Sequence, residues 1–332
     1  MKDLEEERKI LKETLKEIEK KFGKESIMIL GEKPDIACET FSSGSIAIDK
    51  ALGIKGWPKG RIVEIFGPES SGKTTIALHA IAEIQKAGGI AAFIDVEHSI
   101  DPNYAKNLGV DIDNLLLSQP DSGEQALEIV NTLTHTGVID LIVVDSVAAL
   151  VPEAELKGDI RDQVIGGQAR LMSRELRKIT ASLYKNKTTI IFINQIRDKI
   201  GVVFGNPETT PGGRALKFYS SIRMEVRKVQ NITQNGDVTG NQIRCKVVKN
   251  KLASPYKNAQ IEIVFSKGIS KSAELINLAE EYEIINKKGS WYSYNGENIS
   301  QGQTNLQILL ENNLDLYQEI KAKVIEKIEN QG

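Results

Sequence analysis

A phosphate-binding loop constrains the fold of this chain more than any other feature of its sequence. Residues 67–74 read GPESSGKT, which matches the pattern G-x-x-x-x-G-K-[ST]. A predicted strand over 61–66 precedes the motif, and a helical pattern over 74–87 follows it and ends at two glycines. Such a loop binds phosphate because its backbone N–H groups and the N-terminus of the following helix both point at the phosphate oxygens. The sequence therefore predicts a strand, a phosphate-binding loop and a helix in that order.

The middle of the chain alternates between apolar and helical segments. Further strands are predicted over 90–95, 140–144 and 188–194, and further helices over 124–133 and 171–184. Strands that are apolar on both faces must be covered on both faces, which is typical of a mostly parallel central sheet in an α/β protein. Three later strands, over 221–229, 242–249 and 260–265, follow one another without long helices between them. We expect these three strands to extend the sheet by antiparallel pairing.

The two ends of the chain differ from this centre. Residues 3–22 carry apolar side chains at helical spacing among many charges, which indicates an amphipathic helix with a narrow apolar stripe. A stretch with Gly, Pro and Ser follows over 31–45, so this helix packs either on its own domain or on a partner subunit. From about residue 270 the pattern indicates a small α+β module with a hairpin at 291–292.

Composition narrows the class of protein. The net charge is −2, with 27% charged and 40% hydrophobic residues, the balance of an ordinary globular protein. No global positive field attracts nucleic acid, so DNA binding would depend on local basic patches. Cys38 and Cys245 lack metal-ligand spacing, and we expect them to be free thiols in a reducing compartment. With no apolar leader and no spanning segment, we expect a cytoplasmic protein.

The loop predicts where ATP and Mg²⁺ bind. Lys73 is placed to reach the β- and γ-phosphates, and Thr74 is placed to hold Mg²⁺ through its hydroxyl. The loop residues that we expect to contact ATP are Gly67, Pro68, Glu69, Ser70, Ser71, Gly72, Lys73, Thr74 and Thr75.

Three polar side chains follow predicted strands, and ligands collect at the carboxyl edge of a parallel sheet. Asp145 suits a Mg²⁺ site, although an aspartate at a strand end more often caps a helix when no phosphate loop is near. Glu97 is a candidate general base for the attacking water, and its alternative role is that of a surface glutamate. Gln195 is placed to form a hydrogen bond to the γ-phosphate. The predicted catalytic residues are therefore Lys73, Glu97 and Gln195.

Six blocks of sequence carry a resemblance to a known family. They are GPESSGKTT (67–75), FIDVEH (93–98), LIVVDSVAAL (141–150), IFINQIR (191–197), IGVVFGNPETT (200–210) and VVKNK (247–251). Together these blocks resemble the bacterial RecA recombinases, over nearly the whole chain. Other P-loop ATPases share only the first block and the aspartate at the strand end.

The resemblance implies roles for residues that spacing alone does not assign. Glu97 resembles the family's catalytic base, and Gln195 resembles the residue that relays γ-phosphate occupancy to a DNA loop. The N-terminal helix resembles a polymerisation helix that docks on the adjacent protomer, and residues 36–38 resemble the segment that joins the neighbour's sheet. Asp101 and Tyr104 match residues beside the adenine. Lys249 and Lys251 match lysines that reach the adjacent subunit's ATP, and Phe218 matches an aromatic residue at the subunit interface.

Two loops are expected to contact DNA, over about 155–168 and 197–214. Glycines in the second loop allow backbone contact with phosphates, apolar side chains can wedge between bases, and arginines supply charge. The predicted DNA-binding residues of both loops and of the helix after the first are Ile165, Arg170, Ser173, Arg177, Arg197, Val203, Phe204, Gly212, Gly213 and Arg214.

The chain departs from the family pattern at three places. Val96 stands where alanine is common, beside Glu97, and the first loop reads RDQVIGGQAR with Gly167 in place of a leucine. The sequence given also ends at Gly332 without an acidic tail, whose absence we expect to loosen regulation.

The resemblance implies a RecA-type P-loop ATPase core with an N-terminal helix and a small C-terminal domain. The expected domains are 1–33, 34–269 and 270–332. The expected function is ATP-dependent recombination and DNA repair on single- and double-stranded DNA, with self-assembly into a helical filament and support of SOS repressor self-cleavage. The alternatives are a ring helicase with the same core, a small-molecule kinase, and a filament protein that binds ATP without hydrolysing it.

Overall fold

The computed structural model describes residues 4–23, 26–27, 38–158, 166–198, 205, 207–234 and 236–331, and it separates into two compact units, 1–39 and 40–332. In the first unit, α1 (Leu4–Phe22) is a 19-residue helix without a buried residue. Glutamates occupy its first turn and lysines its last, which suits the helix dipole. Its exposed apolar side chains include Leu4, Leu11 and Phe22. The predicted amphipathic helix is confirmed.

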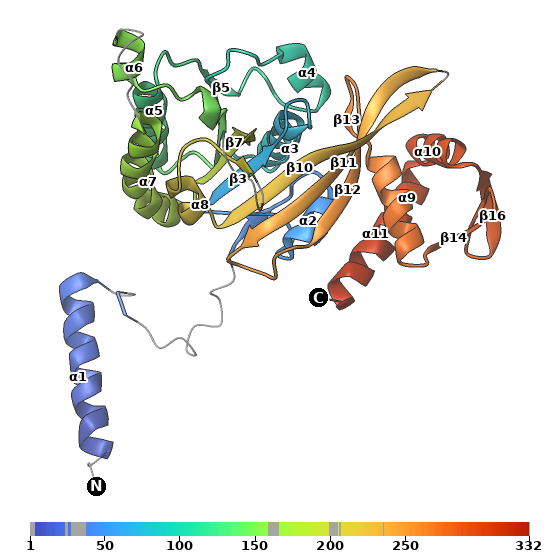
Figure 1. Ribbon diagram of the computed structural model, residues 1–332. Coiled ribbons are helices and arrows are strands. Elements are labelled where there is room, and N and C mark those ends of the chain that lie inside the picture. Colours follow the sequence, from blue (N-terminus) through green and yellow to red (C-terminus); the bar gives the residue numbers. More distant parts are fainter. Residues whose placement is uncertain are drawn as a thin grey trace. The chain divides into compact units, whose positions relative to one another are not determined.

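A nine-stranded sheet forms the centre of the second unit (Figure 1). Its strand order is β13-β12-β11-β10-β3-β7-β6-β4-β5. The strands from β10 to β5 pair in parallel, and those from β10 to β13 pair antiparallel, as the sequence predicted. The bounds are β3 (Ile62–Gly67), β4 (Ala91–Asp95), β5 (Leu116–Ser118), β6 (Leu141–Asp145), β7 (Thr189–Gln195), β10 (Ile222–Gln234), β11 (Asp237–Asn250), β12 (Asn258–Val264) and β13 (Gly268–Ile269).

Helices cover both faces of this sheet and create two hydrophobic cores. α2 (Ile46–Leu52) and α3 (Lys73–Lys86) bury their apolar sides in one core, and α5 (Gly123–Thr136) and α7 (Gly167–Asn186) do so in the other. Alternate residues of one strand enter different cores: Val143 lies in the first and Ile142 in the second. Shorter helical segments are α4 (Pro102–Asn107), η2 (Val147–Ala149), α6 (Glu153–Lys157) and α8 (Ala215–Tyr219). The two-sided covering predicted from the apolar strands is confirmed.

The C-terminal module contains α9 (Lys271–Glu281), α10 (Gln303–Asn312), α11 (Leu314–Gln331) and an antiparallel sheet of β14 (Ile285–Lys288), β15 (Trp291–Tyr294) and β16 (Glu297–Gln301). The hairpin predicted at 291–292 is present, because β14 and β15 pair antiparallel with Lys288 opposite Trp291, and β16 adds a third strand. Glu274 of α9 joins this module to the core, because its carboxylate accepts hydrogen bonds from Ser45 Oγ and from the backbone N–H groups of Ile46 and Ala47.

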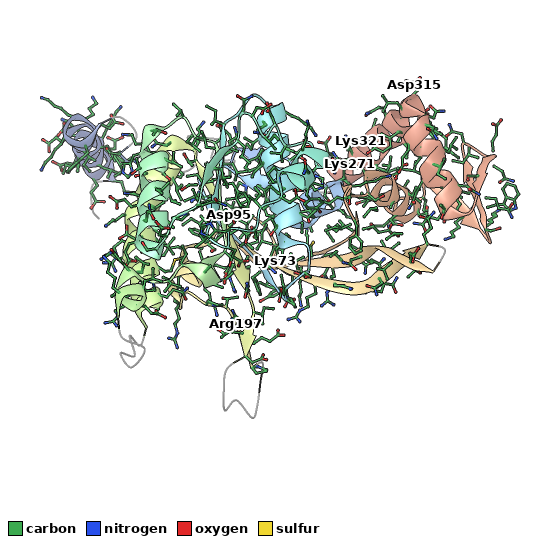
Figure 2. All side chains as sticks on the ribbon, turned by 90° about the horizontal axis from the view of Figure 1, so that it is seen from above. Lys73, Asp95, Arg197, Lys271, Asp315 and Lys321 are labelled. Carbon is green, nitrogen blue, oxygen red and sulfur yellow. The ribbon has the colours of Figure 1, made fainter. Side chains whose placement is uncertain are left out.

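Segments predicted as loops contain additional structure. Two short strand pairs form, β1 (Thr40–Phe41) with β2 (Trp57–Pro58) and β8 (Arg197–Asp198) with β9 (Glu208–Thr209). The first predicted DNA loop is shorter than expected, since part of it lies in α6 and α7 already begins at Gly167. No helix in the described part of the chain is long and apolar enough to cross a membrane. Figure 2 shows Lys73 and Asp95 within the core, and Lys271 and Lys321 in the C-terminal module.

Candidate functional site

The phosphate-binding loop connects the last residue of β3, Gly67, to the first residue of α3, Lys73. A side-chain carbon at Gly67 would lie 2.0 Å from the carbonyl oxygen of Val226, so only glycine fits beside β10. Gly72 has a φ of 93° and would place such a carbon 2.6 Å from Ile263 Cδ1. Both glycines of the motif are therefore required by packing as well as by the turn. The predicted strand, loop and helix are all present.

Lys73, Thr74 and Asp145 lie together at this loop. Thr74 Oγ1 donates a hydrogen bond of 2.7 Å to Asp145 Oδ2, and Lys73 Nζ donates one of 2.6 Å to the carbonyl oxygen of Pro68 in its own loop. Burial lowers the pKa of Lys73, and the nearby Asp145, Glu97 and Glu69 carboxylates oppose that shift. Burial raises the pKa of Asp145 to about 6 against the hydrogen bond from Thr74. A cation and two metal-binding oxygens therefore converge where phosphates would enter.

The register of the sheet brings the strand-end residues to one edge. Asp95 pairs with Asp145, and Gly67 pairs with Gln195. The backbone N–H groups of Val96 and Glu97 donate to the carbonyl oxygen of Asp145, at 2.8 and 3.3 Å. The polar residues at the carboxyl ends of the parallel strands therefore lie at one edge of the sheet, as predicted.

Glu97 is exposed, and its Oε1 accepts two hydrogen bonds from other strand ends. One comes from Gln195 Nε2 at 3.1 Å, and the other comes from the hydroxyl of Ser146. The two residues singled out as candidate base and phosphate reporter thus touch each other. Sequence reasoning missed Ser146, although its place directly after Asp145 is a signal that could have found it.

Asp95 is a second carboxylate that sequence reasoning left without a role. It is fully buried and accepts from the backbone N–H groups of Ser99 and Ile100 and from Gln119 Nε2. These bonds fasten the segment that follows β4, on which Glu97 lies. Asp95 is thus a structural support for the candidate base.

The residues expected beside the adenine lie on and before α4. Asp101 Oδ1 caps this helix by accepting from the backbone N–H groups of Asn103 and Tyr104, at 2.8 and 3.3 Å. The Tyr104 hydroxyl lies 2.8 Å from Thr75 Oγ1, which connects α4 to the phosphate-binding loop. Asp101 therefore orients Tyr104 toward the helix that begins at Lys73.

The residues present fit a Mg²⁺-nucleotide. Within the described ranges, no group of three or more His, Cys, Asp or Glu side chains could hold a metal ion without help. Nucleotide-bound Mg²⁺ needs only one or two protein oxygens, because phosphates and water complete its shell. The hydroxyl of Thr74 and the carboxylate of Asp145 supply such a pair, and the glycines leave room for the backbone to approach phosphates.

The predicted DNA-binding residues that the structure describes lie on three segments. Arg170, Ser173 and Arg177 share one face of α7, at helical spacing, opposite the buried face of that helix. Arg197 is exposed on β8, and Gly212, Gly213 and Arg214 precede α8. Ile165, Val203 and Phe204 lie outside the described residues.

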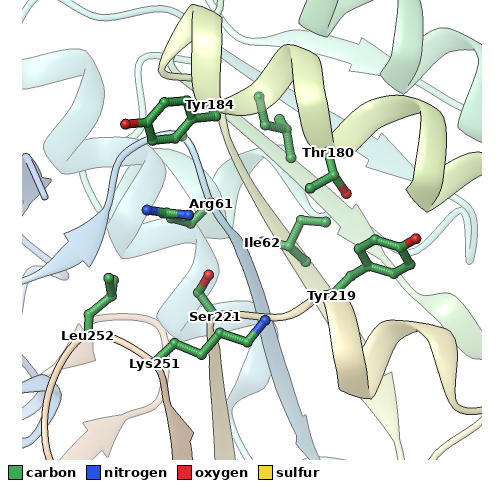
Figure 3. A pocket seen from close by; sticks show the side chains of 10 residues that line it. Arg61, Ile62, Thr180, Tyr184, Tyr219, Ser221, Lys251 and Leu252 are labelled. Carbon is green, nitrogen blue, oxygen red and sulfur yellow. The ribbon is translucent and has the colours of Figure 1, made fainter. Parts of the chain in front are cut away.

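Lys249, Lys251 and Phe218 form one cluster. Lys249 Nζ donates to the carbonyl oxygens of Lys217 and Phe218, and Lys251 Nζ donates to that of Phe218 at 2.9 Å. The Phe218 side chain is 69% exposed, which suits an interface and not a core. Figure 3 shows Lys251 and Ser221 beside Arg61 around a pocket of about 250 Å³. Arg61 precedes β3, so this cluster lies away from the strand end that carries the phosphate-binding loop.

Comparison with known proteins agrees with these motifs. The family model for the RecA N-terminal domain matches residues 9–270, and that for the RecA C-terminal domain matches residues 273–329. Protein RecA of Mesomycoplasma hyopneumoniae is 72% identical over 326 residues, which cover 98% of this chain and 97% of that protein. Protein RecA of Mycoplasma mobile is 69% identical over 98% of both chains. Protein RecA of Macrococcus caseolyticus is 57% identical over 96% of this chain and 90% of its own.

Proposed function

The chain belongs to the RecA family, and we propose how its residues perform the activity of that family. The protein acts in ATP-dependent homologous recombination and DNA repair, as a DNA-dependent ATPase that binds DNA and assembles with itself into filaments. The alternative prediction of a ring helicase is wrong, because the matched family model and the relatives are those of RecA.

In the proposed nucleotide site, the chain holds ATP at the loop between β3 and α3. Lys73 neutralises phosphate charge. Burial lowers the pKa of Lys73, and the negative charge of a bound phosphate opposes this shift because it stabilises the protonated ammonium group. Thr74 and Asp145 hold Mg²⁺, which when bound neutralises charge on the β- and γ-phosphates. Glu97 accepts the proton of the attacking water, and Ser146 orients the Glu97 carboxylate.

The observation that carries the DNA dependence is the hydrogen bond between Gln195 and Glu97. The neighbouring side chain, Asn194, accepts from the Gln195 backbone N–H and donates to the carbonyl oxygen of Pro211, at 3.0 and 3.1 Å. Residues 197–214 form the second predicted DNA loop. A change at the γ-phosphate that moves Gln195 therefore acts on both ends of that loop.

Lys249 and Lys251 are proposed to act on the ATP of an adjacent subunit. The Lys251 N–H donates to the Ser221 carbonyl, and the Ser221 N–H donates to that of Ile62, the first residue of β3. The phosphate-binding loop starts at Gly67, five residues further along the strand, which is about 16 Å at about 3.3 Å per residue. Lys251 therefore lies at the wrong end of β3 to serve its own loop.

The proposal also includes finer points that the family resemblance supports. DNA contacts arise from Arg170, Ser173, Arg177, Arg197 and the segment 212–214, and the filament assists self-cleavage of an SOS repressor. The domains are 1–33, 34–269 and 270–332, and the gap between the two matched family regions, 271–272, supports the second boundary.

The direct test is the rate of ATP hydrolysis with and without single-stranded DNA. We expect DNA to raise turnover in the wild type, and Lys73→Ala to abolish turnover while circular dichroism remains unchanged. Lys86→Ala is the matched control, because Lys86 lies at the other end of the same helix, where its Nζ donates to Glu83 Oε1 at 2.7 Å. Unchanged turnover in Lys73→Ala would remove the nucleotide-site assignment.

A further inference from the structure

Gln168 connects three segments of the chain through the hydrogen bonds of its side-chain amide. It lies in the first turn of α7, at the end of the first predicted DNA loop. Its Nε2 donates to the carbonyl oxygens of Val147 and Leu150, at 2.7 and 3.2 Å, in the segment that follows Asp145. Its Oε1 accepts a hydrogen bond of 3.0 Å from the backbone N–H of Gly212, at the end of the second loop. One amide thus bonds both to the segment that follows β6 and to the end of the second predicted DNA loop.

The end of the second loop is packed tightly at this point. A side-chain carbon at Gly212 would lie 2.9 Å from Val147 Cγ1, and one at Gly213 would lie 2.7 Å from Ala169 Cβ. Both glycines have positive φ, 85° and 73°. Gly212 is also buried, so its N–H depends on the protein for a partner in this state. Gln168 is the partner that supplies the acceptor.

We infer that Gln168 is a positioning residue that restrains the described end of the second loop, at Gly212, by occupying the Gly212 N–H. This inference rests on the proposed role of Gly212 in binding a DNA phosphate. A backbone N–H has one hydrogen to donate, so a phosphate oxygen and Gln168 Oε1 compete for it. Gln168 therefore opposes DNA binding until the loop moves, and the Asn194–Pro211 bond transmits that movement from Gln195.

Removal of the Gln168 amide should raise the affinity for single-stranded DNA in one nucleotide state more than in the other. In Gln168→Ala, affinity for single-stranded DNA in the presence of ADP should rise about 2- to 12-fold, the range that one net hydrogen bond gives. Affinity with a non-hydrolysable ATP analogue should change less, because the bond is already broken in that state. The ratio of the two affinities therefore falls. A residue that only supports the fold would lower both affinities together.

The experiment measures fluorescence anisotropy of a labelled oligonucleotide in both nucleotide states. Gln168→Glu is the second variant. It keeps an acceptor for the Gly212 N–H, but its carboxylate cannot donate to the carbonyl oxygens of Val147 and Leu150 and is repelled by them. The side chain should therefore leave this position, and the hydrogen bond to Gly212 should be lost as well. Gln85→Ala is the matched control, because Gln85 also bonds through its amide to a distant backbone, the N–H and carbonyl of Asp111, both at 2.9 Å. It should leave the affinity ratio unchanged.

A second readout needs no DNA. Trypsin should cleave after Arg197 or Arg214 faster in both Gln168 variants than in the wild type, with Gln85→Ala behaving as the wild type. Unchanged cleavage and an unchanged affinity ratio would overturn the inference, as would an equal loss of affinity in both states. If the wild type itself bound DNA equally with ADP and the analogue, the proposed nucleotide coupling would fail, and the cleavage rates would still decide the role of Gln168.

Discussion

Glu97 shows at the residue scale how a side chain in contact with solvent can still be held in place. Its Oε1 accepts from Ser146 and from Gln195, which come from the ends of two other strands. Neither donor belongs to the phosphate-binding loop. The candidate base is thus oriented independently of the cradle that holds the phosphates, and the two functions should separate on mutation.

Glu97→Gln should therefore reduce hydrolysis about 10²- to 10⁴-fold, the usual contribution of a positioned base, while leaving nucleotide affinity within a few-fold of the wild type. Single-turnover hydrolysis and equilibrium binding of a fluorescent ATP analogue measure the two quantities. Glu128→Gln is the control, on the exposed side of α5. A collapse of affinity together with turnover would show that Glu97 is structural.

Asp49, at the residue scale, makes stability depend on pH. Burial raises its pKa from 3.8 to about 6, against hydrogen bonds from the Ser43 backbone and the Ser42 hydroxyl. The folded state therefore holds this proton more tightly than the unfolded state does. The resulting stabilisation is complete below pH 3.8 and is lost as the pH rises through about 6.

Asp49→Asn should accordingly change the pH profile of unfolding. The free energy of unfolding of the wild type, measured relative to this variant in urea, should fall between pH 4 and pH 7, by at most about 3 kcal/mol for a shift of about two units. Ser43 can still donate to the asparagine oxygen. A difference that stays constant over this range would contradict the raised pKa.

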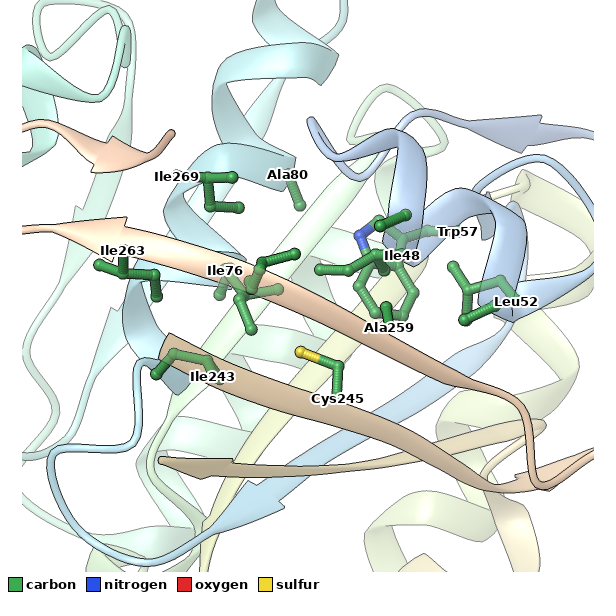
Figure 4. Close-up of a cluster of buried hydrophobic side chains, with 14 of the residues drawn as sticks. Ile48, Leu52, Trp57, Ile76, Ala80, Ile243, Cys245, Ala259, Ile263 and Ile269 are labelled. Carbon is green, nitrogen blue, oxygen red and sulfur yellow. The ribbon is translucent and has the colours of Figure 1, made fainter. Parts of the chain in front are cut away.

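At the element scale, the antiparallel strands do more than widen the sheet. Figure 4 shows Ile243 of β11 and Ile263 of β12 among the buried side chains near Ile76 of α3. Gly72 lies directly against Ile263, so the phosphate-binding loop packs on the side chains of these strands. The position of the loop thus depends on elements that follow it by more than 150 residues in the chain.

Ile263→Ala should lower the free energy of unfolding by about 2–5 kcal/mol, because it leaves a cavity in a packed core. Urea denaturation measures this loss. Ile308→Ala is the control, since Ile308 is 50% exposed on α10 and should cost far less. An equal loss of unfolding free energy in the two variants would show that the side chains packed against the phosphate-binding loop are not tightly packed.

At the scale of the whole molecule, the ATPase site of one chain is incomplete if Lys251 acts in trans. Filament interfaces are heterologous, so one surface of each subunit faces a different surface of the next. Lys251 and the phosphate-binding loop lie at opposite ends of β3 and can meet only across such an interface. The assembled state, not the single chain, is then the active enzyme.

Mixing two inactive variants tests this arrangement. Lys251→Ala keeps an intact loop, and Lys73→Ala keeps intact lysines, so mixed filaments should regain activity. At equal amounts, random assembly makes about one interface in four productive and should restore up to about a quarter of the wild-type rate. Mixing either variant with itself is the control. No recovery at any ratio would place the action of Lys251 within its own subunit.

The sequence by itself determined the features that are local in the chain. The spacing of glycines, lysine and threonine over 67–74 identified the loop, and apolar runs located the strands of the parallel core except β5, because both signals depend on neighbouring residues. Only the tertiary structure decided which strand ends touch. Ser146 and Glu97 are 49 residues apart, Gln195 and Glu97 are 98 apart, and Gln168 and Gly212 are 44 apart. Such contacts follow from how the strands and helices pack, which no local pattern encodes, and these contacts connect the strand ends to the predicted DNA loops.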